Sequence, residues 1–134
     1  MPQLSAAFKI LIQRDCERLV SQQDGVKAAV IASLDGFDVA SATSGPGVDP
    51  SRIAAMASSI SAIGGVVSHE ALIGDAQSVT VKTQSGFLYL SNLIIDAEPY
   101  ILSLICNSEA LLGRIMLESN ALSRKYAQDQ NVSA

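Results

Sequence analysis

The chain has 134 residues, of which 49% are hydrophobic and only 16% are charged, and its formal net charge is −4. This length suits one domain that buries a core without disulfide or metal staples. No basic stripe is present to meet phosphates, which argues against a nucleic-acid partner, and the scarcity of charge favours an oligomer that hides part of the surface.

The cysteines and the N-terminus indicate a reducing compartment. Cys16 and Cys106 lie inside apolar-periodic stretches, which predicts buried free thiols. The first residues lack the basic region and apolar run of a signal peptide. No apolar stretch is expected to be long enough to span a bilayer, and the run that ends at Ile95 is interrupted by Asp96 and Glu98. We therefore expect a cytoplasmic protein with no membrane span.

Residues 5–22 predict an amphipathic helix, because apolar side chains recur at helical spacing and polar ones occupy the rest of the wheel. The apolar stripe consists of Leu4, Phe8, Leu11, Ile12 and Leu19. The charged Asp15 falls near this stripe, and Gly25 follows the helix as a stop signal. One face of this helix should therefore pack on the rest of the domain.

Two strands are predicted next, over 26–34 and 37–43. The first is rich in β-branched and small residues, and the second alternates in polarity. Asp35-Gly36 separates them, and this is the preferred pair for a two-residue type I′ turn. We therefore expect an antiparallel hairpin.

The second half of the chain predicts a helix, three strands and a last helix. Asp49 as N-cap and Pro50 at the first helical position open a helix over 50–69. Strands are predicted over 78–83, 87–95 and 100–106, with a turn at Ser85-Gly86. The last helix is predicted over 109–126, and residues 127–134 should fray. Its apolar face consists of Leu111, Leu112, Ile115, Leu122 and Tyr126.

The predicted order is α-β-β-α-β-β-β-α within a single α/β domain, an α+β sandwich, over 5–126. Almost every connection between strands is short, so the sheet should be mainly antiparallel, with helices on both faces.

The middle helix has two faces without charge. Ile53, Met56, Ile60, Ile63 and Val67 form one face, which is expected to pack on the sheet. Ala54, Ser58, Ser61, Ala62 and Gly65 form the other. Small residues at spacings of four let another backbone approach closely, so the second face predicts a two-fold contact with a second copy. The alternative is an exposed alanine- and serine-rich helix that packs against nothing.

The motifs of common enzymes are missing from the sequence. It has no P-loop and no dinucleotide-binding glycine motif, and its Cys, Asp, Glu and single His form no metal-ligand spacing. Asp96 and Glu98 suit a solvated turn better than an acid–base pair. We expect no catalytic residue, cofactor or metal. Arg52 and His69 remain candidates for partner binding, with a surface role at the helix ends as the alternative.

The stretch 25–36 resembles the opening hairpin of the Roadblock/LC7 family. The small-residue helix over 50–69 and the strands around Ser85-Gly86 follow in the order of that family, so the resemblance covers 5–126. It implies a five-stranded antiparallel sheet with the middle helix on one face and the terminal helices on the other. It also implies dimers in which two sheets join edge to edge and the middle helices pair.

The resemblance further implies partners. Family members associate with Ras-like small GTPases or with dynein as light chains, and some prokaryotic members are GTPase-activating partners that reposition the catalytic residues of the GTPase. The leading hypothesis is a dimeric, non-enzymatic scaffold that binds and regulates a Ras-like small GTPase. A structural adaptor without nucleotide-dependent binding and a small-molecule sensor are the alternatives, and a heterodimer stays open.

Overall fold

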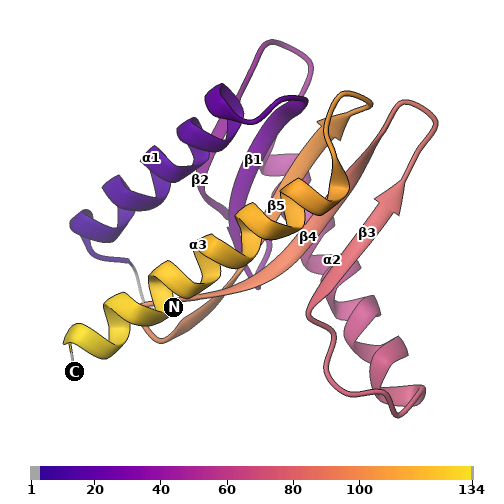
Figure 1. The fold of residues 1–134 in the computed structure, drawn as a ribbon. Helices are drawn as coiled ribbons and strands as arrows, with labels where there is room; N and C mark the ends of the chain where they lie inside the picture. Colours follow the sequence, from indigo (N-terminus) through magenta and orange to yellow (C-terminus); the bar gives the residue numbers. More distant parts are fainter. Residues whose placement is uncertain (1–3, 134) are drawn as a thin grey trace.

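The computed structural model describes the backbone of residues 4–133 and the side chains of residues 4–127. Its helices and strands follow the predicted order, which is thereby confirmed (Figure 1). They are α1 (Ala6–Gln22), β1 (Val26–Ser33), β2 (Asp38–Thr43), α2 (Pro50–Glu70), β3 (Ser78–Lys82), β4 (Gly86–Ile95), β5 (Glu98–Asn107) and α3 (Leu112–Ser133).

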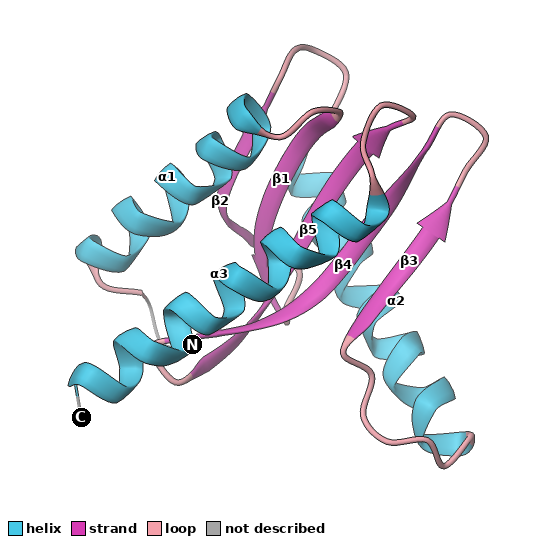
Figure 2. Ribbon diagram, viewed as in Figure 1, coloured by secondary structure: helices cyan, strands magenta, loops and turns pink. Residues whose placement is uncertain are grey.

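The strands form one antiparallel five-stranded sheet in the order β2-β1-β5-β4-β3. α1 covers β1 and β2 and α3 covers β4 on one face, while α2 lies alone on the other face (Figures 1 and 2). The predicted three-layer arrangement is therefore confirmed, and each face of the sheet is shielded by helices.

The main core lies between the sheet and the layer formed by α1 and α3. In β5, Leu102 and Leu104 face this core, whereas Ile101 faces α2. Cys16 and Cys106 also belong to it as free, buried thiols, as predicted. Burial raises the pKa of Cys16 to about 12 and that of Cys106 to about 11, so both stay protonated and unreactive at neutral pH.

A buried carboxylate joins the two helices of this layer. Asp15 of α1 is only 4% exposed. Its Oδ2 accepts a hydrogen bond from the Tyr126 hydroxyl at 2.6 Å and lies 3.0 Å from Nζ of Lys125, both on α3. A buried charge is tolerated when it is paired and hydrogen-bonded in this way. Asp15, which the sequence placed near the apolar stripe of α1, therefore links α1 to α3.

Replacing Asp15 should test this link. We expect Asp15→Ala to lower the free energy of unfolding by roughly 3 kcal/mol, because Lys125 and Tyr126 lose a shared charged acceptor. Urea denaturation measures the change, and Arg14→Ala, on an exposed position of the same helix, is the matched control. Equal stability of the two variants would show that the contact contributes nothing.

The first hairpin turns differently from the prediction. A type I′ turn needs positive φ at both central residues, but only Gly36 has one, at 91°. The N–H of Gly36 donates to the carbonyl of Ser33 at 3.0 Å, and that of Ser33 donates to the carbonyl of Phe37 at 2.9 Å. The loop therefore has three residues and ends in a left-handed glycine, so the type I′ prediction is wrong.

The last helix is also displaced from its prediction. Asn107 Oδ1 accepts the N–H of Glu109 in a turn, and α3 begins only at Leu112. Leu111 and Leu112 are exposed, so placing them on the buried face was wrong, whereas Ile115, Leu122 and Tyr126 are buried as predicted. The helix continues to Ser133 through most of the stretch that was expected to fray.

Candidate interaction surface

The helix α2 begins as its sequence predicts. The Asp49 carboxylate accepts the backbone N–H of Ser51 at 3.0 Å and its hydroxyl at 2.8 Å, and Pro50 occupies the first turn. These hydrogen bonds hold the pKa of Asp49 below its ordinary value. Arg52 is exposed, with its Nε 3.7 Å from Asp49 Oδ2. Local hydrogen bonds therefore mark the start of the helix.

The small side chains of α2 form its contact with the sheet. Ala54 packs on Val30 and Ala32 and is 0% exposed. Ala57 packs on Leu90 and Ile101 and is 1% exposed. Farther along, a Cβ added to Gly64 would lie 2.9 Å from Cγ2 of Val79, so the helix backbone is close to the sheet there as well.

The packing of Ala54 and Ala57 on the sheet corrects the predicted assignment of the two faces of α2. Ile53 and Ile60 are half-buried against the sheet, in keeping with the prediction. Met56, Ile63 and Val67 were also expected there, but they are 53%, 64% and 61% exposed. A face without charges gives no sign of which side meets solvent, and small residues let a helix lie closer to the strands than large ones do.

The residues predicted for the two-fold contact differ in their exposure to solvent. Ala54 cannot touch a second copy, because its own sheet covers it completely, so that assignment is wrong. Ser58 and Ser61 are half-buried beside the sheet. Ala62 and Gly65 are exposed, and their contact with a partner stays a prediction.

Large apolar side chains gather on the side of α2 that faces solvent. We define the outer face as Met56, Ile63, Val66 and Val67, each more than half exposed. Leu72 and Ile73, in the segment after the helix, are 89% and 79% exposed. Contiguous apolar surface on a small domain marks an interaction site. The sequence did not predict that these side chains would be exposed. The signal available was the absence of Lys and Glu along the helix, which left no charged side to face solvent.

An open sheet edge lies beside this helix. β3 pairs only with β4, contacts α2 and exposes nearly all of its residues (Figure 2). Its outward backbone N–H and C=O groups can pair with a strand of another chain.

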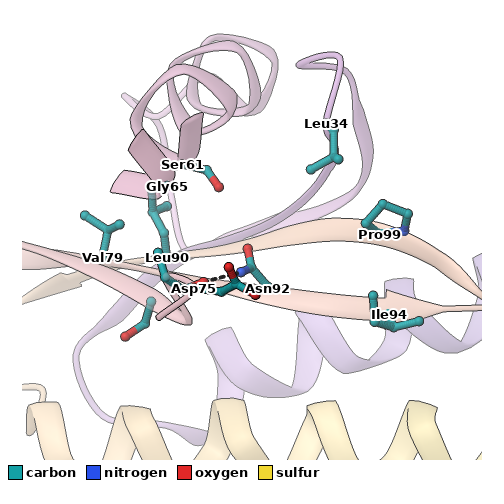
Figure 3. A pocket seen from close by; sticks show the side chains of 11 residues that line it. Leu34, Ser61, Gly65, Asp75, Val79, Leu90, Asn92, Ile94 and Pro99 are labelled. Carbon is teal, nitrogen blue, oxygen red and sulfur yellow. Dashed lines mark hydrogen bonds between the residues drawn. The ribbon is translucent and has the colours of Figure 1, made fainter. Parts of the chain in front are cut away.

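A cavity of about 350 Å³ opens between α2 and the sheet. Figure 3 shows Ser61 and Gly65 on the helix side, Val79 and Leu90 below them, and Leu34 and Pro99 across the opening. The Asn92 amide at its base donates to the carbonyl of Ala76 at 2.9 Å, so one of its few polar groups is already bonded. The cavity suits an apolar side chain better than a polar ligand.

The other proposed contact residues lie far apart. Arg52 is in the first turn of α2 and His69 in the last, so about 25 Å of helix separates them at 1.5 Å per residue. They cannot form one compact site. Within the part of the chain that the structure describes, no group of three or more His, Cys, Asp or Glu could hold a metal ion.

By length and composition, α2 would pass as a membrane span. An 18-residue window has a mean hydropathy of 1.2, and 11% of it is buried. The expectation that no stretch of the chain would qualify is therefore wrong. Length and composition do not distinguish a span from an apolar surface helix, and here Ala54 and Ala57 pack on the sheet of a folded domain.

Comparison with known families fits this geometry. The family model of the Roadblock/LC7 domain matches residues 12–95, from within α1 to the end of β4. This chain belongs to the Roadblock/LC7 family. Membership places it among regulatory and adaptor domains rather than classical enzymes. No curated protein sequence matches it.

Solved Roadblock/LC7 structures share the fold. A structure of MglB with a tetrameric arrangement superimposes with a TM-score of 0.78 at 16% identity, covering 98% of this chain and 96% of that one. Myxococcus xanthus MglB gives 0.76 at 17% identity, covering 96% of each chain. A Roadblock/LC7 domain from Streptomyces avermitilis gives 0.71 at 23% identity, with coverage of 84% and 92%. Likeness at such identities concerns the fold alone.

The close seating of α2 can be tested by enlarging one alanine. Ala57→Leu should lower the free energy of unfolding by about 1–3 kcal/mol, since the added atoms have no space between helix and sheet. Ala55→Leu, on an exposed position two residues away, should stay within about 0.5 kcal/mol of the parent. Urea unfolding at several protein concentrations would measure both, and a harmless Ala57→Leu would refute the seating.

Proposed function

We propose that this Roadblock/LC7 domain is a dimeric, non-enzymatic scaffold that binds and regulates a Ras-like small GTPase in the cytoplasm. The observation that carries the proposal is the outer face of α2 beside the open edge of β3. Two kinds of surface that favour a second protein, apolar side chains and unpaired backbone, lie next to each other. The family supplies the class of partner.

A second copy of the chain suits this combined surface. In a symmetric dimer each β3 would pair with the other and each outer face would meet its own copy. Such a contact would cover Ile63, Val66 and Val67 and satisfy the backbone of β3 at the same time. MglB, one of the similar structures, has a tetrameric arrangement, which supports self-association as a property of this fold.

The dimer predicts a specific effect of charge on the outer face. Ile63→Glu should yield a monomer in sedimentation, because burying an unpaired carboxylate at a two-fold contact costs several kcal/mol, on the order of 3–5. Leu117→Glu is the matched control, since Leu117 on α3 has the same 64% exposure but lies across the sheet. A dimeric Ile63→Glu would rule out this face. Ala54 is unsuitable for this test, because it is core in a single chain.

The regulatory role predicts nucleotide dependence. The tagged domain should retain a small GTPase, identified by mass spectrometry, from lysate loaded with a non-hydrolysable GTP analogue, and far less from lysate loaded with GDP. Only a difference in affinity lets a partner shift the GTPase between states. A single-turnover GTP hydrolysis assay with the purified pair would then show whether the domain accelerates the reaction.

Other results of this capture support other roles. Equal retention in both nucleotide states would favour the structural adaptor, and absence of a GTPase in both would end the regulatory proposal. Arg52→Ala belongs in the hydrolysis assay, because an inserted arginine is worth a factor of roughly 10³–10⁵. We expect a small effect, since a scaffold acts by positioning the residues of the GTPase.

A further inference from the structure

The sheet has two edges, and they are not equivalent. The order β2-β1-β5-β4-β3 leaves β2 at one end and β3 at the other. A chain with two open edges can add strands at both and grow into a filament, whereas a chain with one open edge stops at a closed pair. The chemistry at the outer side of β2 therefore decides how far assembly can proceed.

The outer side of β2 is occupied by a side chain of α1. The backbone N–H of Ser41 donates to Oε1 of Gln13 at 3.2 Å, and Nε2 of Gln13 donates to the carbonyl of Ser41 at 2.8 Å. Ser41 lies inside β2, where its register partner on β1 is Val30. The primary amide therefore makes the pair of hydrogen bonds that one residue of a neighbouring antiparallel strand would make.

A second contact fixes the orientation of this amide. Nε2 of Gln13 also donates to Oε1 of Glu17, one turn later on α1, at 3.1 Å. Turning the amide over would set its oxygen against both the Glu17 carboxylate and the Ser41 carbonyl, which are acceptors only. Glu17 therefore holds Gln13 in the one orientation that matches the backbone of Ser41.

The opposite edge lacks such a cap. Among the side chains that the structure describes, none makes a hydrogen bond to the backbone of β3, and four of the five β3 residues are exposed. Ser41, inside β2, is thus capped by a side chain, whereas the residues of β3 have no such contact. Capping one edge is a known way for natural sheets to prevent unlimited strand addition.

We propose that Gln13 is an edge cap that confines strand addition to β3 and so ends self-assembly at a closed complex. The occupant that it excludes is the β-strand edge of another copy of this chain. The inference rests on the proposed function only for the oligomeric state of the wild type, because the hydrogen bonds between Gln13 and Ser41 lie within one chain.

The test removes the cap and measures size. Gln13→Ala should show a weight-average mass in sedimentation that exceeds the wild-type value and rises with protein concentration. Gln22→Ala, on an exposed position of the same helix, should sediment as the wild type does. Adding Ser41→Pro to Gln13→Ala should restore the wild-type mass, because proline has no N–H to offer and is tolerated on edge strands.

Hydrogen exchange at the Ser41 amide checks the contact itself. In dilute Gln13→Ala the amide should exchange roughly fivefold faster than in the wild type, as expected for the loss of one hydrogen bond. If that variant loses its fold, Gln13→Met serves instead, since its thioether keeps the length of the side chain but offers no donor and only a weak acceptor in place of the amide.

Each outcome decides the proposal. Wild-type mass for Gln13→Ala at every concentration, unchanged exchange at Ser41, or growth that Ser41→Pro fails to reverse would overturn the cap. Growth that the proline reverses supports it. A monomeric wild type would end the proposed dimer and the open role of β3, whereas growth of Gln13→Ala from that monomer would still support the cap at β2.

Discussion

The close approach of α2 to the sheet governs what the rest of the domain can present. Ala54 and Ala57 bring the helix backbone near β1 and β5, and Gly64 does so near Val79. A helix seated on small side chains has no room to bury its large ones, so Met56, Ile63 and Val67 turn to solvent. The apolar outer face is thus a consequence of how the core is packed. The same seating places this face beside β3, so one partner can meet helix and strand together.

The other face of the sheet carries the main core. α1 and α3 cover a large continuous core, and the buried Asp15 ties them together through Lys125 and Tyr126. The same α1 also extends Gln13 to the edge of β2. One helix therefore supports the core, contacts α3 and caps a residue of a sheet edge, whereas α2 and β3 present the apolar outer face and an edge strand without such a cap.

The sequence predicted the element order and most boundaries because those depend on local signals. Asp49-Pro50 opened α2 as expected, and the alternating strands paired as a five-stranded antiparallel sheet. The prediction failed where the environment of a residue depends on another helix or strand. Both sides of α2 lack charge, so the wheel alone could not say that Ala54 meets the sheet and Ile63 meets solvent. Asp35-Gly36 suited a two-residue turn, yet a register shift in β1 between Ile31 and Ala32 leaves a three-residue loop.

The long-range contacts that reasoning from sequence missed join residues far apart in the chain. Gln13 and Ser41 are 28 positions apart, and Asp15 and Tyr126 are 111 apart. Nothing in composition or periodicity pairs them, because a glutamine on an amphipathic helix reads as an ordinary polar residue. Asp15 gave a partial signal, since a charge near an apolar stripe demands a partner, but the sequence could not name that partner.

The distribution of charge also bears on how a scaffold of this kind would act on a GTPase. Arg52 is the arginine on α2, and its guanidinium lies beside Asp49, whose carboxylate already caps the helix. Inserting Arg52 into a nucleotide site would mean giving up that ion pair, which is exposed and therefore weak, so charge alone does not prevent it. The position of Arg52 matters more than its ion pair. Arg52 stands in the first turn of α2, the helix whose apolar outer face is proposed to meet the second copy. In the proposed dimer the second copy covers the outer face and β3, so a GTPase would meet other surfaces of the assembly, and holding its loops in place there can lower a barrier without donating a catalytic group.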